Sequence, residues 1–346
     1  MLSGFFGRFS KNLGVDLGTS NTLIVQSDKG IVVDSPTVVA INNKTNQIIA
    51  VGHEAKDMVG KIPPYIDTYL PLTRGIISDY EITEKLLRYL INRVHEQSTA
   101  LIPRPRVLVG VPLEATEVER KAVEDVVLAA GSREVIMVED VMAAAVGARL
   151  PIEEPVGSMI VDIGGGKTEV AVISLGGIVE WRMSPFAGIE MNKQVVAYTR
   201  DVFNLLLGEA NAESVKIQLG SAVALSEPLQ VNVRGRDVIT GLPKEVLMTD
   251  THVREAIDKT LKSVVDTVKN VLEVTPPELV ADIHERGIVL VGGGSLLRGI
   301  DSLIHRETDI SVRVTDDPLT AIVRGMGVLF EGSEPLNTVR LPSARD

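Results

Sequence analysis

The sequence has no cysteine, few aromatic residues and no long hydrophobic run. The absence of cysteine excludes disulfides, thiolate metal ligands and cysteine nucleophiles. Aromatic residues make up only 3% of the 346 residues, so no platform for stacking nucleic-acid bases is expected. No stretch approaches the roughly 18 uninterrupted apolar residues that a membrane-spanning helix needs. With a hydrophobic content of 45%, the chain is expected to be a soluble, folded protein.

Positive charge is also scarce. The chain has 35 Lys and Arg residues against 46 Asp and Glu residues, which gives a formal net charge of −11. A whole-surface attraction to phosphates or anionic lipid is therefore not expected, and neither is a nucleic-acid partner. The five histidines are dispersed without metal-ligand spacing, which predicts no transition-metal site.

Strand-like runs rich in Val and Ile alternate with helical patterns along the chain, which predicts an α/β fold. Helices are predicted over about 79–96, 116–131 and 251–272. Thr116 and Glu119 have the spacing of a capping box at the start of the second helix. A connector with two prolines, LPIEEPVG, predicts a boundary near residue 150 between two halves of similar size.

Two segments have the pattern of a β-hairpin whose turn follows an aspartate. In residues 12–26, NLGVDLGTSNTLIVQ, Asp16 precedes the turn and a second β run follows it. The same plan returns in residues 158–175, SMIVDIGGGKTEVAVISL, where Asp162 precedes three glycines. The sequence therefore predicts the same feature twice, a β-hairpin with an aspartate just before its turn.

Glycine turns of this kind suit phosphate binding, because backbone N–H groups can converge on an anion without obstruction by Cβ. Hydroxyls at Thr19, Ser20 and Thr168 can add donors. Two such hairpins that face one another would hold a polyphosphate, and their aspartates would hold the waters of a Mg²⁺ ion. A third glycine turn at 292–294 follows a buried strand and precedes a helical segment, so it could receive the nucleoside end or an α-phosphate.

Other interpretations of these turns fit less well. A single glycine cluster is more often only a tight turn, but three clusters, two of them with matched acids, favour a binding site. A P-loop ends in the same residues as the segment Gly166, Lys167 and Thr168. However, that motif needs glycine at the position of Val161, and it needs a helix where this sequence predicts a strand. The glycine triplet at 292–294 lacks the G-x-G-x-x-G spacing of dinucleotide-binding turns.

These residues carry a resemblance to a known family. The segments VDLGTSNT, VDIGGGKTEVAV and VGGGSLLRG resemble those of the actin, Hsp70 and sugar-kinase superfamily. The segments RGIISDYEI, GVPLEATEVER, VEDVMAAAVG and TPPELVADIHERG are similar to those of the bacterial rod-shape-determining actins, the MreB family, over nearly the whole chain. The resemblance implies an actin-like ATPase fold of two lobes. Each lobe would have a duplicated mixed β-sheet core flanked by helices and a small outer subdomain.

The expected domain boundaries combine the connector with this resemblance. The first lobe is expected over 1–149, with an outer subdomain at about 33–75 and an amphipathic segment at 1–11. The second lobe is expected over 150–315, with an outer subdomain at about 188–249. A C-terminal segment, 316–346, is expected to return to the first lobe.

ATP and Mg²⁺ are the cofactors that the resemblance implies, with the metal held through water by Asp16 and Asp162. The stretch NAESVKIQLG resembles the family's ribose and adenine segment, although Glu213 and Lys216, three apart on one helical face, are equally suited to a surface ion pair. The residues implied to bind the nucleotide are Asp16, Gly18, Thr19, Ser20, Asn21, Gly164, Gly165, Gly166, Glu213, Ser214, Val215, Lys216, Gly292, Gly293, Gly294 and Ser295.

The chain departs from the family pattern at two catalytic positions. Relatives have Glu-Pro where this chain has Asp140-Val141, and Thr where it has Lys167, and that Glu and Thr are implied to position the attacking water. Asp140 is one methylene shorter than Glu, and a misplacement of about 1 Å can cost about 100-fold in rate. Lys167 brings a cation toward the γ-phosphate but cannot act as a base while protonated. With Asp140, Lys167 and Asp162 as catalytic residues, we expect ATP hydrolysis that is slow or absent relative to the family, unless other residues compensate.

The N-terminus is enriched in the scarce aromatics. No acid precedes Asp16, whereas Arg8, Lys11 and the α-amino group are positive, so this end can approach anionic headgroups. The alternative is a segment that folds onto the protein's own surface. Four apolar residues follow i, i+3, i+4, i+7 spacing and predict a short amphipathic helix: Leu2, Phe5, Phe6 and Phe9.

The family also inserts an apolar loop into membranes. Leu101 and Ile102 occupy the matching place, and ordinary core packing is the alternative for both residues.

The resemblance implies a cytoskeletal protein that polymerises with itself into filaments on the cytoplasmic face of the cell membrane. Its further partners would be membrane proteins of cell-wall synthesis and morphogenesis, and its role the determination of cell shape. The alternative is a small-molecule kinase of the same superfamily, which would need a catalytic base and a larger sugar-binding insertion. A chaperone nucleotide-binding domain is disfavoured, because the chain ends soon after Phe330.

Overall fold

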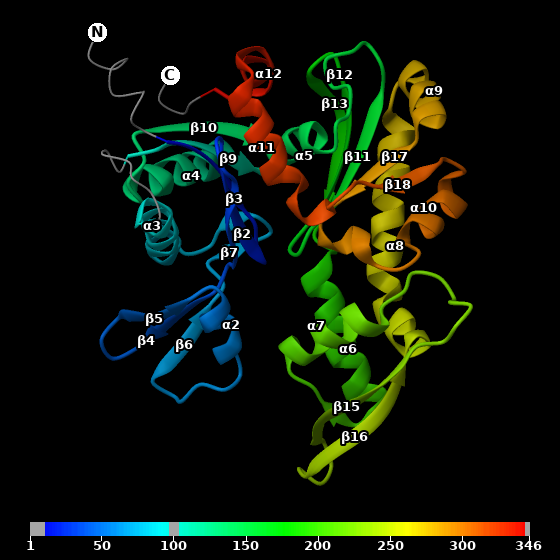
Figure 1. The fold of residues 1–346 in the computed structure, drawn as a ribbon. Coiled ribbons are helices and arrows are strands. Elements are labelled where there is room, and N and C mark those ends of the chain that lie inside the picture. The colour runs from blue at the N-terminus through cyan, green and yellow to red at the C-terminus, as the bar shows by residue number, and fades with distance from the viewer. Residues whose placement is uncertain (1–10, 97–103, 343–346) are drawn as a thin grey trace. The chain divides into compact units, whose positions relative to one another are not determined.

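The fold is described from a computed structural model, which describes residues 11–96 and 104–342 (Figure 1). The chain divides into two compact units, and each is described by itself. Unit 1 comprises Met1–Pro155, Ser174–Gly177 and Leu319–Asp346, and unit 2 comprises Val156–Ile173 and Ile178–Pro318. The change of unit at Pro155 falls inside the proline-containing connector.

Unit 1 is organised around a five-stranded mixed sheet with the strand order β10-β9-β1-β2-β3. β1 pairs antiparallel with β2, which confirms the first predicted hairpin, and parallel with β9. The central strands are buried on both faces, as expected for strands covered by helices on each side. The bounds are β1 Asn12–Leu17, β2 Asn21–Gln26, β3 Gly30–Pro36, β9 Arg106–Val111 and β10 Glu134–Glu139.

Helices of unit 1 begin where the sequence supplies caps. The predicted capping box is present, since the Thr116 side chain accepts from the Glu119 N–H and Glu119 bonds back to the Thr116 N–H. At the preceding helix, Asp79 accepts from the Ile82 N–H at 3.0 Å. The helices are α3 Tyr80–Glu96, α4 Glu117–Ala129, α5 Asp140–Gly147, α11 Ala321–Glu331 and α12 Ser333–Val339.

Helices α5 and α11 pack against each other unusually closely. A Cβ atom added to Gly147 would lie 1.9 Å from the Ala321 carbonyl oxygen, and one added to Gly325 would lie 1.7 Å from the Ala143 carbonyl oxygen. Glycine at both positions lets the two backbones touch. Because α11 also packs on β1 and β2, it joins the C-terminal segment to the sheet that carries Asp16.

A smaller part of unit 1 contains a three-stranded sheet of order β5-β4-β6 and its own small apolar core. It follows β3, which ends at Pro36 and belongs to the central sheet. The elements of this part and of the hairpin after it are β4 Val39–Asn42, β5 Gln47–Val51, α2 His53–Met58, β6 Ile66–Tyr69, β7 Leu72–Thr73 and β8 Ile76–Ile77.

Unit 2 repeats the architecture with a five-stranded sheet of order β13-β12-β11-β17-β18. β11 pairs antiparallel with β12, which confirms the second predicted hairpin, and parallel with β17. The strand that follows Lys167 rules out the helix of a P-loop. The bounds are β11 Ser158–Ile163, β12 Thr168–Ser174, β13 Gly177–Ser184, β17 Ile288–Val291 and β18 Val312–Val314.

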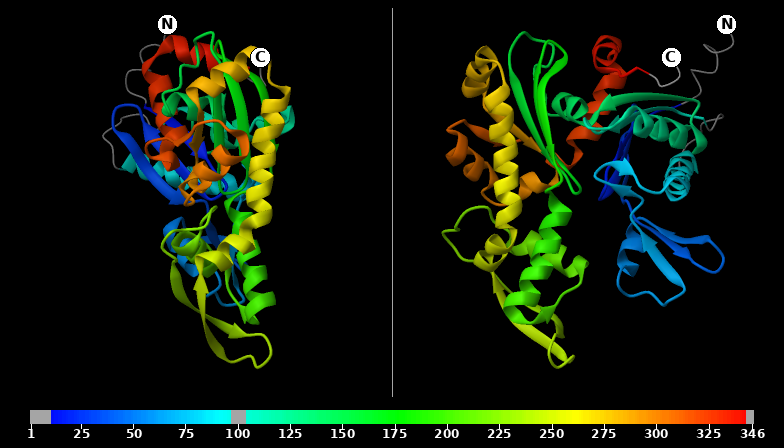
Figure 2. Two further views of the ribbon diagram at one scale, coloured as in Figure 1. Left: turned by 90° about the vertical axis from the view of Figure 1, so that its right-hand side faces the viewer. Right: turned by 180° about the vertical axis from the view of Figure 1, so that it is seen from behind.

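The longest helix of unit 2 is α8, Asp250–Val274, close to the predicted 251–272. It runs beside the five-stranded sheet and reaches the base of the β15–β16 hairpin (Figures 1 and 2). The remaining elements of the unit are α6 Gly188–Phe203, β14 Leu205–Leu206, α7 Glu209–Leu219, β15 Gln230–Asp237, β16 Pro243–Thr249, α9 Pro277–Arg286 and α10 Ile300–Thr308.

Two short 3₁₀ helices follow the third glycine turn, η1 Gly293–Leu296 and η2 Pro318–Thr320. The helical segment predicted after this turn consists of η1, which already begins at Gly293, and of α10, which begins at Ile300. The chain rejoins unit 1 at Leu319, near the predicted position 316.

Candidate functional site

The first candidate turn joins β1 to β2 in unit 1. Asp16 is only 9% exposed and pairs across the hairpin with Leu23. The turn is held by three bonds: Thr37 Oγ donates to the Gly18 carbonyl at 2.7 Å, the Thr37 N–H donates to the Ser20 carbonyl at 2.9 Å, and the Gly75 N–H donates to Thr19 Oγ at 2.8 Å. A hydroxyl can accept and donate at once, so Thr19 can still donate to an anion.

Asp140 lies in the same unit, at the first position of α5, and is buried. Its Oδ1 sits over strand β9, because a Cβ atom added to Gly110 would lie only 2.1 Å from that oxygen. The carboxylate therefore occupies a place at the end of the central sheet that only a glycine in β9 leaves open.

The second candidate turn joins β11 to β12 in unit 2 and has the same register as the first. Asp162 is 4% exposed and pairs across the hairpin with Glu169, and the Gly164 N–H closes the turn by donating to the Lys167 carbonyl at 3.0 Å. The third glycine turn adjoins it. Gly292 has φ +78°, and a Cβ atom there would lie 2.2 Å from Asp162 Oδ1. Glycine at 292 thus leaves the space that the Asp162 carboxylate fills.

Lys167 forms a buried ion pair next to this turn. Its Nζ lies 2.5 Å from Glu169 Oε2, and the Glu169 side chain has no exposed surface. The Lys167 ammonium, which was expected to lie toward the γ-phosphate, is therefore paired with the carboxylate of Glu169 in the same hairpin.

The start of α6 adjoins the glycine turn of unit 2. The N–H groups of Gly188 and Ile189 donate to the Gly164 and Gly165 carbonyls at 3.1 and 2.8 Å. Lys216 Nζ donates to the Gly188 carbonyl at 2.9 Å. The glycine turn, the α6 N-terminus and a cation from α7 therefore meet in one place, and this combination suits an anion.

The predicted nucleotide contacts on α7 differ in their exposure. The Val215 side chain is 4% exposed and packs in the core of unit 2. Ser214 is exposed and accepts from Gln218 Nε2 at 2.8 Å, and Glu213 is half-buried. Ser295, in the third turn, is buried and donates to the Gly292 carbonyl at 2.7 Å, so it holds the turn in shape.

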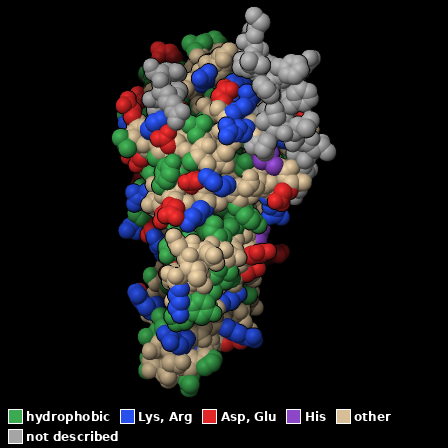
Figure 3. Space-filling view, turned by 90° about the vertical axis from the view of Figure 1, so that its left-hand side faces the viewer, with side chains coloured by type: hydrophobic (Ala, Val, Ile, Leu, Met, Phe, Trp, Pro, Cys, Tyr) green, Lys and Arg blue, Asp and Glu red, His purple; other side chains and the backbone are tan. Residues whose placement is uncertain are grey.

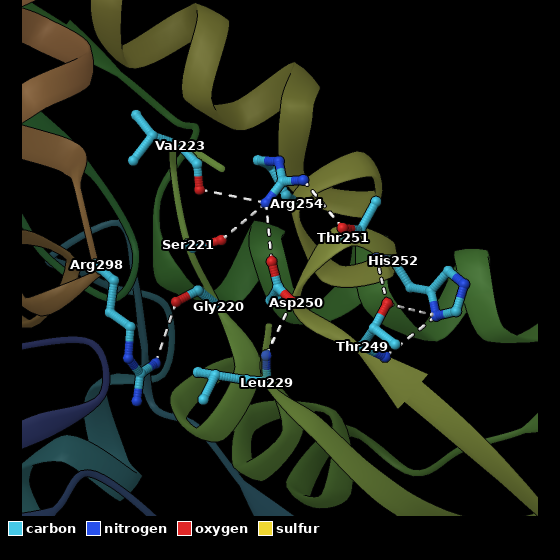
Figure 4. A network of polar contacts seen from close by, with 10 residues as sticks. All are labelled: Gly220, Ser221, Val223, Leu229, Thr249, Asp250, Thr251, His252, Arg254 and Arg298. Atoms are coloured by element: carbon cyan, nitrogen blue, oxygen red, sulfur yellow. Dashed lines mark hydrogen bonds and ion pairs between the residues drawn. The ribbon is translucent and has the colours of Figure 1, made fainter. Parts of the chain in front are cut away.

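The sequence did not indicate three residues that shape these turns. Thr37 lies in a loop of unit 1 with no sequence motif around it, and its hydrogen bond to the Gly18 carbonyl is seen only in the structure. Gly188 begins a helix but lacks a capping side chain before it. Arg298 follows the third glycine turn and contacts the end of α7, as Figure 4 shows.

The carboxylates of the two hairpins suit a hard divalent cation. Within residues 11–96 and 104–342, no three His, Asp or Glu side chains gather as metal ligands. Asp16 and Asp162 are buried carboxylates near the ends of β1 and β11, each just before a turn, and Mg²⁺ takes one or two carboxylates while it keeps several waters. The residues therefore fit a hydrated Mg²⁺ ion accompanying a phosphate chain.

The predicted membrane contacts fall outside the described residues: Leu2, Phe5, Phe6, Phe9, Leu101 and Ile102. In the described part of the chain, no helix combines the length and the apolar character that crossing a bilayer requires. On the face drawn in Figure 3, basic and acidic side chains are interspersed without a continuous basic area.

Comparison with known proteins identifies the family. The MreB/Mbl protein family matches residues 10–338. The chain is 45% identical over 335 residues to the cell shape-determining protein MreB of Escherichia coli (strain K12), covering 96% of each chain. The chain belongs to the MreB/Mbl family. The cell shape-determining protein Mbl of Bacillus subtilis (strain 168) is 38% identical, with 95% of this chain and 98% of Mbl covered.

Solved structures of MreB relatives share the fold. MreB5 of Spiroplasma citri bound to ADP matches with a TM-score of 0.90 at 36% identity, covering 95% of this chain and 98% of that one. The same protein bound to AMPPNP matches with a TM-score of 0.89 at 35% identity and the same coverage. A MamK double helical filament matches with a TM-score of 0.79 at 23% identity, covering 93% of this chain and 99% of that one, which shows likeness of fold alone. The predicted actin-like fold and the resemblance to the MreB family are both confirmed.

Proposed function

We propose that this chain is an ATP-binding protein that polymerises into actin-like filaments on the cytoplasmic face of the cell membrane. Through membrane proteins of cell-wall synthesis and morphogenesis, the filaments would determine cell shape. The observation that carries the proposal is the matched pair of hairpins, which place Asp16 and Asp162 at the same register before a turn. The proposal is supported by relatives that are cell shape-determining proteins and by an MreB5 relative bound to ADP and to AMPPNP.

In this proposal, the turn of each hairpin binds phosphate through its backbone. The backbone of Gly18 to Asn21 and of Gly164 to Gly166 would bind the phosphates, with Lys216 beside the second turn. Asp16 and Asp162 would hold the waters of Mg²⁺, which neutralises phosphate charge when bound. Glu213 and the turn from Gly292 to Ser295 would flank the adenosine.

We further propose that hydrolysis is slow relative to other family members. Asp140 reaches less far than glutamate, and the Lys167 ammonium bonded to Glu169 can neither accept a proton nor orient a water as a hydroxyl does. Phosphate release at saturating ATP measures this directly. Replacing Asp140 with Glu should raise the rate, by up to about 100-fold if the reach of the carboxylate limits it. A wild-type rate equal to that of ordinary relatives would contradict the proposal.

Filament formation is the decisive test of the main function. Purified full-length protein should sediment and show filaments by negative-stain electron microscopy with ATP and Mg²⁺, and Asp162→Asn should abolish this by removing a metal-facing charge. Asp201→Asn removes an exposed carboxylate of the same unit and serves as the control. A chain that binds no nucleotide, or stays monomeric with every nucleotide, would overturn the proposal.

Membrane attachment is tested separately, because it rests on the N-terminal sequence. A filament displays many copies of a weak anchor, and multivalency multiplies weak contacts. Replacing Phe5 and Phe6 with Ser should therefore release filaments from anionic liposomes while leaving assembly intact. Replacing Leu101 and Ile102 with Ser tests the loop in the same assay. Unchanged co-sedimentation with liposomes in both variants would count against the anchor.

A further inference from the structure

Helix α7 of unit 2 is tied to two different glycine turns by two basic side chains. On one side, Lys216 Nζ donates to the Gly188 carbonyl at 2.9 Å, and the Gly188 N–H donates to the Gly164 carbonyl at 3.1 Å. This chain of bonds joins α7 to the second turn, which belongs to the phosphate side of the site.

On the other side, Arg298 joins the end of α7 to the third turn. Its Nη1 donates to the carbonyls of Ile217 and Gly220, each at 3.2 Å. Its own carbonyl accepts from the Ala222 N–H at 2.7 Å. Arg298 comes three residues after Ser295, and the Leu297 N–H returns to the Gly294 carbonyl at 3.1 Å. Arg298 is therefore close in sequence to the third turn, and a backbone hydrogen bond fixes the short segment between them.

The last carbonyls of a helix lack partners within the helix and favour a cation. A basic residue of α7 itself would satisfy that need without linking anything else. Here the cation comes from a segment 78 to 81 residues further along the chain. Arg298 therefore links the end of α7 to the segment that follows the third turn.

We propose that Arg298 is a positioning residue for the nucleoside part of the bound nucleotide. This inference rests on the proposed ATP binding, in which α7 and the third turn flank the adenosine. Arg298 holds these two walls at a fixed spacing, whereas Lys216 serves the phosphate side. Loss of Arg298 should therefore weaken recognition of the nucleoside while the phosphate contacts persist.

Arg254, in α8, is a matched control, because its side chain contacts the same loop. Its Nη1 donates to Ser221 Oγ at 3.2 Å, to the Val223 carbonyl at 3.2 Å and to Asp250 Oδ2 at 3.1 Å. These partners lie outside α7 and outside the third turn, and Figure 4 shows the two arginines holding neighbouring stretches of the loop. Both arginines act on backbone that follows α7, but only Arg298 reaches the helix itself.

The experiment measures competition of ATP, GTP and inorganic tripolyphosphate, each with Mg²⁺, against a fluorescently labelled ATP bound to the full-length protein. The variants are Arg298→Gln, Arg298→Lys and Arg254→Gln. Loss of two charge-assisted hydrogen bonds should weaken ATP binding about tenfold in Arg298→Gln and lower the preference for ATP over GTP. Tripolyphosphate should compete as with wild type, Arg298→Lys should recover part of the ATP affinity, and Arg254→Gln should keep the wild-type ratios.

Three results would overturn the inference: unchanged ATP binding and base preference in Arg298→Gln, an equal loss for ATP and tripolyphosphate, or the same change of ratios in Arg254→Gln. Failure of the wild-type protein to bind ATP would instead overturn the proposed function, so the two failures are distinguishable. If tripolyphosphate binds too weakly to compete, the ratio of ATP to GTP affinity decides.

Discussion

The hairpins of the two units share their backbone plan and differ in what faces the aspartate. In unit 1, Asp16 is opposite Leu23, whereas in unit 2, Asp162 is opposite Glu169. Directly opposed side chains lie on the same face of a sheet, so a second carboxylate adjoins the acid in unit 2 alone. Two neighbouring buried carboxylates repel each other, and the cation of Lys167 offsets that repulsion.

The position of Lys167 corresponds to Asn21 in the other hairpin, directly before the matched threonines Thr168 and Thr22. A neutral amide suffices in unit 1, because Leu23 brings no charge. Lys167 therefore neutralises Glu169 within the hairpin, and is not simply an added positive charge for the phosphates.

Removing the Lys167 charge should have the largest effect. Lys167→Met leaves Glu169 buried without its cation, and breaking a buried pair in this way costs about 3 kcal/mol of unfolding free energy or more. The corresponding Asn21→Met in unit 1 should cost less than about 1 kcal/mol. Urea denaturation measures both. The double change Lys167→Met with Glu169→Gln should recover most of the loss, and equal stability of Lys167→Met and wild type would break the comparison.

The matched aspartates provide the next test. Asp16→Asn and Asp162→Asn each remove one charge toward Mg²⁺, and loss of such a group typically lowers affinity about 10- to 100-fold. Titration of Mg²⁺–ATP into each variant, with Asp201→Asn as the surface control, measures the two effects. Similar losses support equivalent roles for the hairpins. Wild-type affinity in either variant would show that the duplication does not extend to the metal.

Gly292 tests how tightly the third turn supports Asp162. Gly292 has φ +78° and ψ 165°, a backbone conformation almost restricted to glycine, so an alanine there adds strain of about 1–3 kcal/mol and a Cβ 2.2 Å from Asp162 Oδ1. Gly30 in unit 1 has the same φ of +78° but no atom within 4 Å of an added Cβ, so Gly30→Ala should show the strain alone. Thermal unfolding and Mg²⁺–ATP titration should show the greater loss in Gly292→Ala. Equal effects of the two alanines would mean that the contact with Asp162 is relaxed at no cost.

A pH response located in unit 1 is the smallest expected effect. Burial, followed by the charge of Lys11, lowers the pKa of His95 below its usual 6.5. The unfolded chain then binds more protons than the folded one, so stability should fall as the pH drops below about 6.5, by less than about 1 kcal/mol. Unfolding curves between neutral and mildly acidic pH measure it. His95→Leu should flatten the response, and His252→Gln in unit 2 should leave it in place.

The hairpins and the helix starts could be predicted because their causes are local. Alternating apolar residues around Asp16 and Asp162, with glycine or hydroxyl residues in the turns, specify antiparallel pairing between neighbours in sequence. The capping box at Thr116 depends on residues three apart. The sequence indicated a helical segment after the third glycine turn, but it did not indicate that this segment begins with a 3₁₀ helix, which depends on backbone bonds within the turn.

The family, the two hairpins and the residue types that suit phosphate and Mg²⁺ could be inferred from the sequence, because these depend on short-range patterns. The folded structure was needed to show that Val215 faces the core, that Gly292 leaves room for Asp162 and that Arg298 contacts the end of α7. Each of those outcomes depends on segments that are distant in sequence and meet only when the sheet and its helices pack together. Burial and register, which no single segment encodes, are what assign a side chain to the core or to the site.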